Sequence, residues 1–169
     1  MKIRTSTDSD LDSLVALFTE SVHQIAARSY TPAQLAAWAP ESPDLELWRS
    51  RLALVETLVA EIDEALAGFV SYTRDGHIEF LFTSPAFSRQ GVASALFEAA
   101  AQRLHSMGAN RLSTDASLEA RPFFEAKGFR TVEEQVVERN GVQFRRFAMA
   151  RACDDFQQGQ VADTRALRD

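Results

Sequence analysis

A chain of 169 residues, 46% of them hydrophobic, is long enough for one domain with a buried core and short for two. Its formal net charge of −6 at pH 7 excludes a general nucleic-acid surface, which needs clustered lysine and arginine facing the phosphates. One cysteine, Cys153, and three scattered histidines exclude an internal disulfide and form no metal-ligand cluster, so we expect no bound metal.

The first half of the chain predicts helices near the amino terminus, followed by a strand hairpin. Apolar side chains at positions 14, 17, 18, 22 and 25 recur at helical spacing. Pro40 and Pro43 interrupt the helical region that follows. In chain order we expect a strand at residues 3–5, a capping region at 8–10, a helix at 11–28, helical segments from 32 and at 45–52, and strands at 57–63 and 66–73 that pair around Glu64.

Turn signals divide the second half of the chain. The pairs Asp75-Gly76 and Asn140-Gly141 are typical of tight turns before or between strands, whereas Gly108 and Gly128 follow helical patterns. In chain order we expect a strand at 77–83, a helix at 92–107, a strand at 111–115, a short helix at 117–127, and a hairpin of strands at 129–138 and 142–151. The order is β-α-α-β-β-β-α-β-α-β-β in a single domain, residues 1–152, with a polar, frayed tail at 153–169.

The two ends of the chain give no membrane signal. No uncharged apolar stretch approaches the length of a bilayer span, and the first residues, MKIRTS, turn polar at once. These features predict a cytoplasmic protein with no membrane partner. The sequence leaves the oligomeric state open, and a homodimer is compatible with it.

Residues 83–96, TSPAFSRQGVASAL, are the most informative segment of the chain. An apolar strand passes through a proline turn and a glycine-containing loop straight into an alanine-rich helix. Free backbone N–H groups and the helix dipole favour a phosphate there. Gly91 and Ala93 would keep side chains out of the way, while Ser88, Arg89 and Ser94 add polar donors. A loop glycine before a helix can also serve only to end one element and begin the next, so this pattern alone leaves both interpretations open.

This segment resembles the loop of the GNAT superfamily of acetyl-CoA-dependent N-acetyltransferases. The family pattern is Gln or Arg, two free positions, Gly, one free position, then Gly or Ala. Gly91 and Ala93 match it, whereas Ser88 stands where Gln or Arg is usual. The predicted element order also resembles the GNAT core along nearly the whole chain.

A second segment resembles the late part of the same family's pattern. That pattern usually reads Asn, two free positions, Ala, two free positions, Phe-Tyr, and then Gly-Phe a few residues on. Ser117 replaces the Asn, and Phe124 replaces the Tyr that in many members protonates the leaving thiolate. The matching residues are Ala120, Phe123, Gly128 and Phe129. Phe124 cannot act as an acid. The thiolate of a thiol with a pKa near 8.5 is nevertheless a good leaving group and can depart without a proton from the protein.

The resemblance implies an α/β (α+β) fold whose mixed, mostly antiparallel sheet of about seven strands is flanked by helices. It also implies acetyl-CoA as co-substrate. The residues it places against acetyl-CoA are Leu81, Phe82, Thr83, Ser88, Arg89, Gln90, Gly91, Val92, Ala93, Ser94, Ser117 and Phe124. In this scheme a backbone N–H of the strand at 81–83 holds the oxyanion that develops during transfer.

Acetyl transfer needs a neutral amine, yet an alkylammonium near pKa 10.4 is uncharged in only about one molecule in 2,500 at pH 7. Simple alternation along the strand at 77–83 puts Ile78, Phe80 and Phe82 on one face, with positions 77, 79, 81 and 83 on the other. The resemblance implies His77 as the base, with Glu79 next on that face. Alternatively, His77 is a solvated turn residue and Glu79 an exposed partner for an arginine.

The resemblance places the acceptor between the first two helices and the last hairpin. The residues it nominates are His23, Tyr30, Trp38, Trp48, Phe144 and Arg145. Each could equally be a core or rim residue. We therefore expect transfer of an acetyl group to the amine of a small molecule, with protein or peptide N-acetylation as the nearest rival. A degenerate acyl-CoA-binding sensor is the alternative from another class, because Ser88, Ser117 and Phe124 depart from the pattern.

Overall fold

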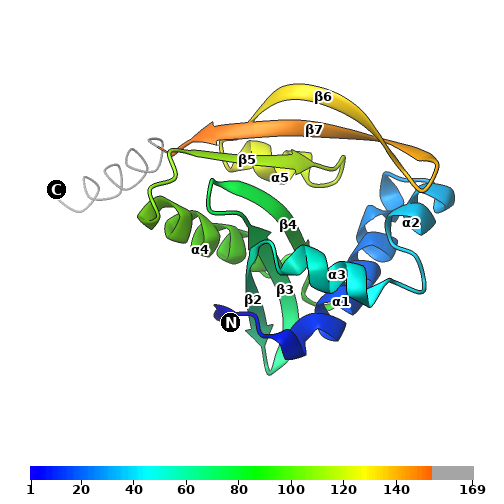
Figure 1. Ribbon diagram of the computed structural model, residues 1–169, viewed down its shortest axis with the longest axis horizontal. Helices are drawn as coiled ribbons and strands as arrows, with labels where there is room; N and C mark the ends of the chain where they lie inside the picture. The colour runs from blue at the N-terminus through cyan, green and yellow to red at the C-terminus, as the bar shows by residue number, and fades with distance from the viewer. Residues whose placement is uncertain (154–169) are drawn as a thin grey trace.

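A seven-stranded sheet organises the residues that the computed structural model describes, 1–153 (Figure 1). The strand order is β1-β2-β3-β4-β5-β7-β6, and every neighbouring pair except β4 and β5 is antiparallel. The strands are β1 (Lys2–Thr5), β2 (Glu56–Ile62), β3 (Ala65–Tyr72), β4 (His77–Thr83), β5 (Arg111–Ala116), β6 (Arg130–Arg139) and β7 (Val142–Ala152). The mixed, mostly antiparallel sheet that the family resemblance implied is therefore confirmed.

Helices cover both faces of this sheet. They are α1 (Leu11–Ile25), α2 (Pro32–Trp38), α3 (Leu45–Leu52), α4 (Val92–Ser106) and α5 (Arg121–Ala126). The first helix ends three residues earlier than predicted, in a 3₁₀ turn at Ala26–Arg28. The last helix starts at Arg121 instead of residue 117, because the Ser117 hydroxyl accepts a hydrogen bond from the Ala120 amide and holds a turn.

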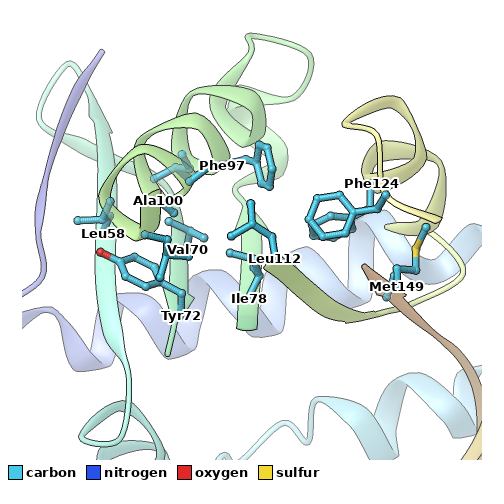
Figure 2. Packing of buried hydrophobic residues seen from close by; sticks show 14 of the residues in the cluster. Leu58, Val70, Tyr72, Ile78, Phe97, Ala100, Leu112, Phe124 and Met149 are labelled. Carbon is cyan, nitrogen blue, oxygen red and sulfur yellow. The ribbon is translucent and has the colours of Figure 1, made fainter. Parts of the chain in front are cut away.

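Two hydrophobic clusters fix the helices to the sheet. Helix α4 packs on one face, where Phe97, Ala100, Ile78 and Leu112 are buried together (Figure 2). Helices α1, α2 and α3 contribute to a second cluster, which reaches the sheet through residues such as Phe80. Strand β4 thus lies between two apolar layers, so polar side chains on this strand require an explanation.

A β-bulge in β4 changes which side chains share a face. Ser71 of β3 lies opposite Phe80, but the next residue, Tyr72, lies opposite Ile78, so Glu79 is the extra residue. Ile78 therefore packs under α4, whereas Phe80 and Phe82 pack toward α1. The prediction that these three residues share one face was wrong, because an inserted residue reverses the alternation beyond it.

The parallel pairing between β4 and β5 is short. It comprises only His77 opposite Ser113 and Ile78 opposite Thr114, and the buried Thr114 hydroxyl donates to the Ile78 carbonyl at 2.9 Å. Beyond this point residues 79–83 follow β3, while the end of β5 stays beside β7 (Figure 1). We call the space where the two strands diverge the β4–β5 fork.

The carboxyl end of the described chain is part of the fold. Cys153 is buried, and its amide donates to the Asn110 carbonyl at 2.9 Å. The rest of the predicted tail, residues 154–169, lies outside the described residues. Within residues 1–153, no helix is long and apolar enough to cross a membrane.

One charged network joins the first strand to the first helix. Arg4 of β1 donates to both carboxylate oxygens of Asp10, at 2.8 and 3.0 Å, and to Glu61 of β2 at 2.8 Å. The Thr7 amide also donates to Asp10, at 2.7 Å. The hydrogen bonds from Arg4 are the main reason that the pKa of Asp10 falls from its ordinary value of 3.8 to about 2.

We predict that Asp10→Asn lowers the free energy of unfolding at pH 7 by about 1 kcal/mol. Because the pKa of Asp10 is lower in the folded state, its carboxylate stabilises the fold at pH values above the unfolded-state pKa, and this stabilisation is lost as the pH falls through the folded-state pKa. The difference in unfolding free energy between the variant and the wild type should therefore shrink from about pH 4 to about pH 2. Denaturant unfolding at a series of pH values measures this, with the exposed Asp12→Asn as control. A deficit that stayed constant down to pH 2 would contradict the prediction.

Candidate active site

A cavity of about 740 Å³ opens beside the β4–β5 fork, between α1, the α2–α3 segment and the β6–β7 hairpin. Aromatic rings form its apolar wall. Phe18 of α1 packs edge-on against Trp48 and Phe82, with ring centroids 4.7 and 4.8 Å apart, and Trp38 lies 6.3 Å from Phe82. These packed rings give the cavity one apolar side of low dielectric constant.

Polar groups gather where the fork begins. His77 Nδ1 and the Ser113 hydroxyl are hydrogen-bonded at 2.9 Å. His77 Nε2 lies 3.7 Å from a carboxylate oxygen of Glu79 and 3.8 Å from one of Asp115. All three ionisable side chains line the cavity and are partly exposed. The structure therefore brings the two predicted base candidates together and adds Asp115, so a proton can be taken up directly or through a water.

A smaller cavity of about 180 Å³ continues from the fork toward the start of α4. The two cavities share six lining residues: Trp38, Leu81, Phe82, Ser117, Ala120 and Phe124. Thr83 and Ala93 line the smaller one only, at its α4 end. The path runs along the edge of β4, and beyond Ile78 no strand among residues 1–153 pairs with that edge. An extended ligand could therefore hydrogen-bond to the backbone there.

The amino terminus of α4 has the geometry of an anion site. Gly91 precedes the helix with φ of 76°, a left-handed conformation that favours glycine, and a side chain added there would meet nothing within 4 Å. No side-chain hydrogen bond caps the first turn. Ser88, Arg89, Gln90 and Gly91 are exposed, and Ser94 is partly exposed. Val92 is buried in the core, so only its backbone could face a ligand.

The late segment forms the apolar floor of the fork. Phe124 is 2% exposed and packs against Phe123 and Phe129, with ring centroids 5.3 and 5.1 Å away. It has no proton to give. Ser117 lines both cavities, and its hydroxyl already accepts from the Ala120 amide at 3.1 Å.

The predicted acceptor residues separate into two groups. Trp38 and Trp48 line the larger cavity, whereas Tyr30 and Phe144 are buried behind Trp38, with ring centroids 5.3 and 6.4 Å from it. Burial raises the pKa of Tyr30, whose hydroxyl accepts from the Leu118 amide at 2.9 Å.

The other two predicted acceptor residues face elsewhere. His23 bonds to the Ala39 carbonyl at 2.7 Å and so holds the segment after α2, while Arg145 pairs with Glu134 on the surface. Neither residue lines the two cavities described above.

Several charged residues of the cavity were not predicted from the sequence. Asp115 lies in β5, where a carboxylate within an interior strand was an available signal. Arg51, Arg139 and Arg146 come from α3 and the last hairpin, and nothing in their spacing shows that they converge. Among the described residues, no group of three or more His, Cys, Asp or Glu side chains is placed to hold a metal ion.

Comparison with known proteins identifies similar acetyltransferases by sequence. Residues 26–151 match the family model described as an acetyltransferase (GNAT) domain. The chain is 37% identical over 149 residues to the uncharacterized N-acetyltransferase YafP of Escherichia coli K12, covering 88% of this chain and 94% of that protein.

Two solved structures show the same fold. A GCN5-related N-acetyltransferase from Rhodopseudomonas palustris superposes with a TM-score of 0.86 at 28% identity, over 89% of this chain and 94% of that one. The PaiA N-acetyltransferase from Thermoplasma acidophilum, solved with coenzyme A, superposes with a TM-score of 0.66 at 21% identity, over 89% and 98% of the two chains.

Proposed function

The chain belongs to the GNAT family of N-acetyltransferases, and we propose that it transfers the acetyl group of acetyl-CoA to the amine of a small-molecule acceptor. The observation that carries this proposal is the β4–β5 fork, which connects an uncapped helix terminus to a cavity containing His77, Glu79 and Asp115. One end suits the phosphates of a nucleotide thioester, and the other suits an amine that must lose a proton.

The residues of the smaller cavity fit acetyl-CoA. Backbone amides at the start of α4, beside Gly91, would bind the pyrophosphate, and Arg89 would add positive charge. The open edge of β4 at residues 81–83 would pair with the pantetheine arm, whose thioester end would lie over Phe124. The PaiA enzyme of similar fold holds coenzyme A, which supports this assignment.

The larger cavity would bind and deprotonate the acceptor. The amine nitrogen forms a bond to the acetyl carbon, the carbon–sulfur bond breaks, and the amine loses a proton to Glu79 or His77, directly or through a water. The thiolate leaves as CoA and takes a proton from water, since Phe124 cannot supply one. A backbone N–H near Leu81 would stabilise the oxyanion during transfer.

The walls of the cavity favour a small acceptor over a protein. Gln34 of α2 donates to the Gln143 carbonyl at 3.0 Å, and Asn140 at the hairpin tip donates to the Ala37 carbonyl at 3.0 Å. These bonds join α2 to the β6–β7 hairpin, so that the cavity has a continuous wall on this side. A peptide chain would need an open groove there.

We predict CoA release when acetyl-CoA is mixed with a panel of small amines, and none above the hydrolysis background with peptides. A thiol-detecting assay measures release, and mass spectrometry identifies the acetylated product. Acetylated peptide without turnover of any small amine would favour the protein-acetylating alternative. Binding of acetyl-CoA with no turnover of either class would favour a sensor.

We predict that Gly91→Glu abolishes measurable acetyl-CoA binding, because it places bulk and negative charge where backbone amides should meet the pyrophosphate. Gly108→Glu is a matched control, since Gly108 ends the same helix with φ of 89° and equally open space. Both variants should fold with a similar loss of stability. Calorimetry showing unchanged affinity in folded Gly91→Glu would remove this loop from the site.

We predict that Glu79→Gln and His77→Ala each lower kcat. The variant that removes the proton acceptor should lose about 10²- to 10⁴-fold, and acetyl-CoA binding should be almost unchanged in both. His105→Ala, exposed near the far end of α4, is the control. If both side chains act through one water, the double variant should lose less than the product of the single losses. Full activity in both single variants, with the wild-type acidic limb of kcat/KM, would show that neither is the base.

A further inference from the structure

Three arginines converge on the larger cavity from two of its walls. Arg51 lies in the last turn of α3, Arg139 ends β6, and Arg146 lies in β7. They come together only in the folded chain. The same cavity contains Glu79 and Asp115, each with a carboxylate oxygen within 4 Å of His77 at the fork.

Two of these arginines have no carboxylate within ion-pair distance among the residues that the structure describes. Arg146 lies 3.9 Å from Asp115 and donates to Gln135 at 2.8 Å. Arg51 and Arg139, in contrast, form no ion pair with any of residues 1–153. The remaining carboxylate of the cavity, Asp44, accepts from the Leu47 amide as the cap of α3.

Aromatic rings hold the guanidinium group of Arg51, and the charge of Arg139 is affected by its neighbours in the cavity. Arg51 lies over the rings of Trp48 and Phe80, 5.7 and 5.5 Å from their centroids. Arg139 is exposed as a whole residue, but desolvation, followed by repulsion from Arg51 and Arg146, lowers the pKa of its guanidinium. Attraction by Glu79 opposes this more weakly. The cavity therefore brings three arginine charges together, and among residues 1–153 only Arg146 has a carboxylate within ion-pair distance.

We propose that the acceptor carries an anionic group, a carboxylate or a phosphorus oxyanion, which Arg51 and Arg139 bind while its amine lies beside His77 and Glu79. The proposal rests on the proposed acetyl transfer and names its substrate class. Arginine presents paired N–H donors that match the oxygens of such groups. An acceptor with one positive and one negative charge complements the cavity. The carboxylates of the cavity lie at the fork, and Arg51 and Arg139 lie on the α3 and hairpin walls.

The test compares each acid with its neutral counterpart. Acceptors are the protein α-amino acids and 4-aminobutyrate, each beside its carboxamide, with 2-aminoethylphosphonate to separate phosphorus oxyanions from carboxylates. The enzyme variants are Arg51→Gln and Arg139→Gln. Matched controls are Arg49→Gln, on α3 outside the cavity and paired with Glu46, and Arg130→Gln, at the other end of β6.

We expect the wild type to prefer an acid over its amide, and each variant to raise KM for that acid about 10- to 100-fold. KM for acetyl-CoA and for the amide should stay unchanged, as should all values in the controls. Equal use of acid and amide, or a rise in KM for acetyl-CoA instead, would overturn the proposal.

Calorimetry with the same acid and amide pairs separates this proposal from acetyl transfer itself. Acid binding that disappears in the two variants supports the anion site even if no acetyl group moves, and then only the proposed function fails. Acid binding that persists in folded Arg51→Gln and Arg139→Gln would overturn the anion site, whatever the activity.

Discussion

The candidate site depends on one constraint, the early end of pairing between β4 and β5. The two strands hold together through two residue pairs and the Thr114 hydroxyl, and then each follows its antiparallel neighbour. The β4-α4-β5 crossover places the start of α4 at one end of the resulting fork. As a result, backbone edge, helix terminus and cavity lie along one continuous path. No single side chain creates this arrangement, which explains why departures such as Ser88 are compatible with it.

The bulge at Glu79 determines what the fork contains. By shifting the alternation, it sends Phe80 and Phe82 into the aromatic wall under α1, while Ile78 remains under α4. Glu79 itself is left outside the regular pairing and partly exposed, close to His77. In a regular strand Ile78, Phe80 and Phe82 would all lie on one face, so the aromatic wall would not form together with the packing of Ile78 under α4. The irregularity therefore accounts both for the apolar wall and for an exposed carboxylate 3.7 Å from His77.

The sequence predicted the elements and their order well, because helical periodicity, proline breaks and glycine turns are local signals. His77 and Glu79 could be named from the strand before the loop. The bulge could not, because a single extra residue has no signature in the hydrophobic pattern. Arg51 and Arg139 could not be foreseen either, since their meeting depends on how α3 and the last hairpin fold over the sheet. His23 and Arg145 were nominated by element alone, and their side chains point to Ala39 and Glu134.

A crystal structure of the protein with coenzyme A tests the central claim most directly, that the fork brings the thioester and the amine together. We expect the pyrophosphate at the backbone amides beside Gly91 and the pantetheine arm along residues 81–83. The thiol should then lie above Phe124, facing the larger cavity and Glu79. Coenzyme A bound away from the fork, or with its thiol closed off from the cavity that holds His77 and Glu79, would contradict it.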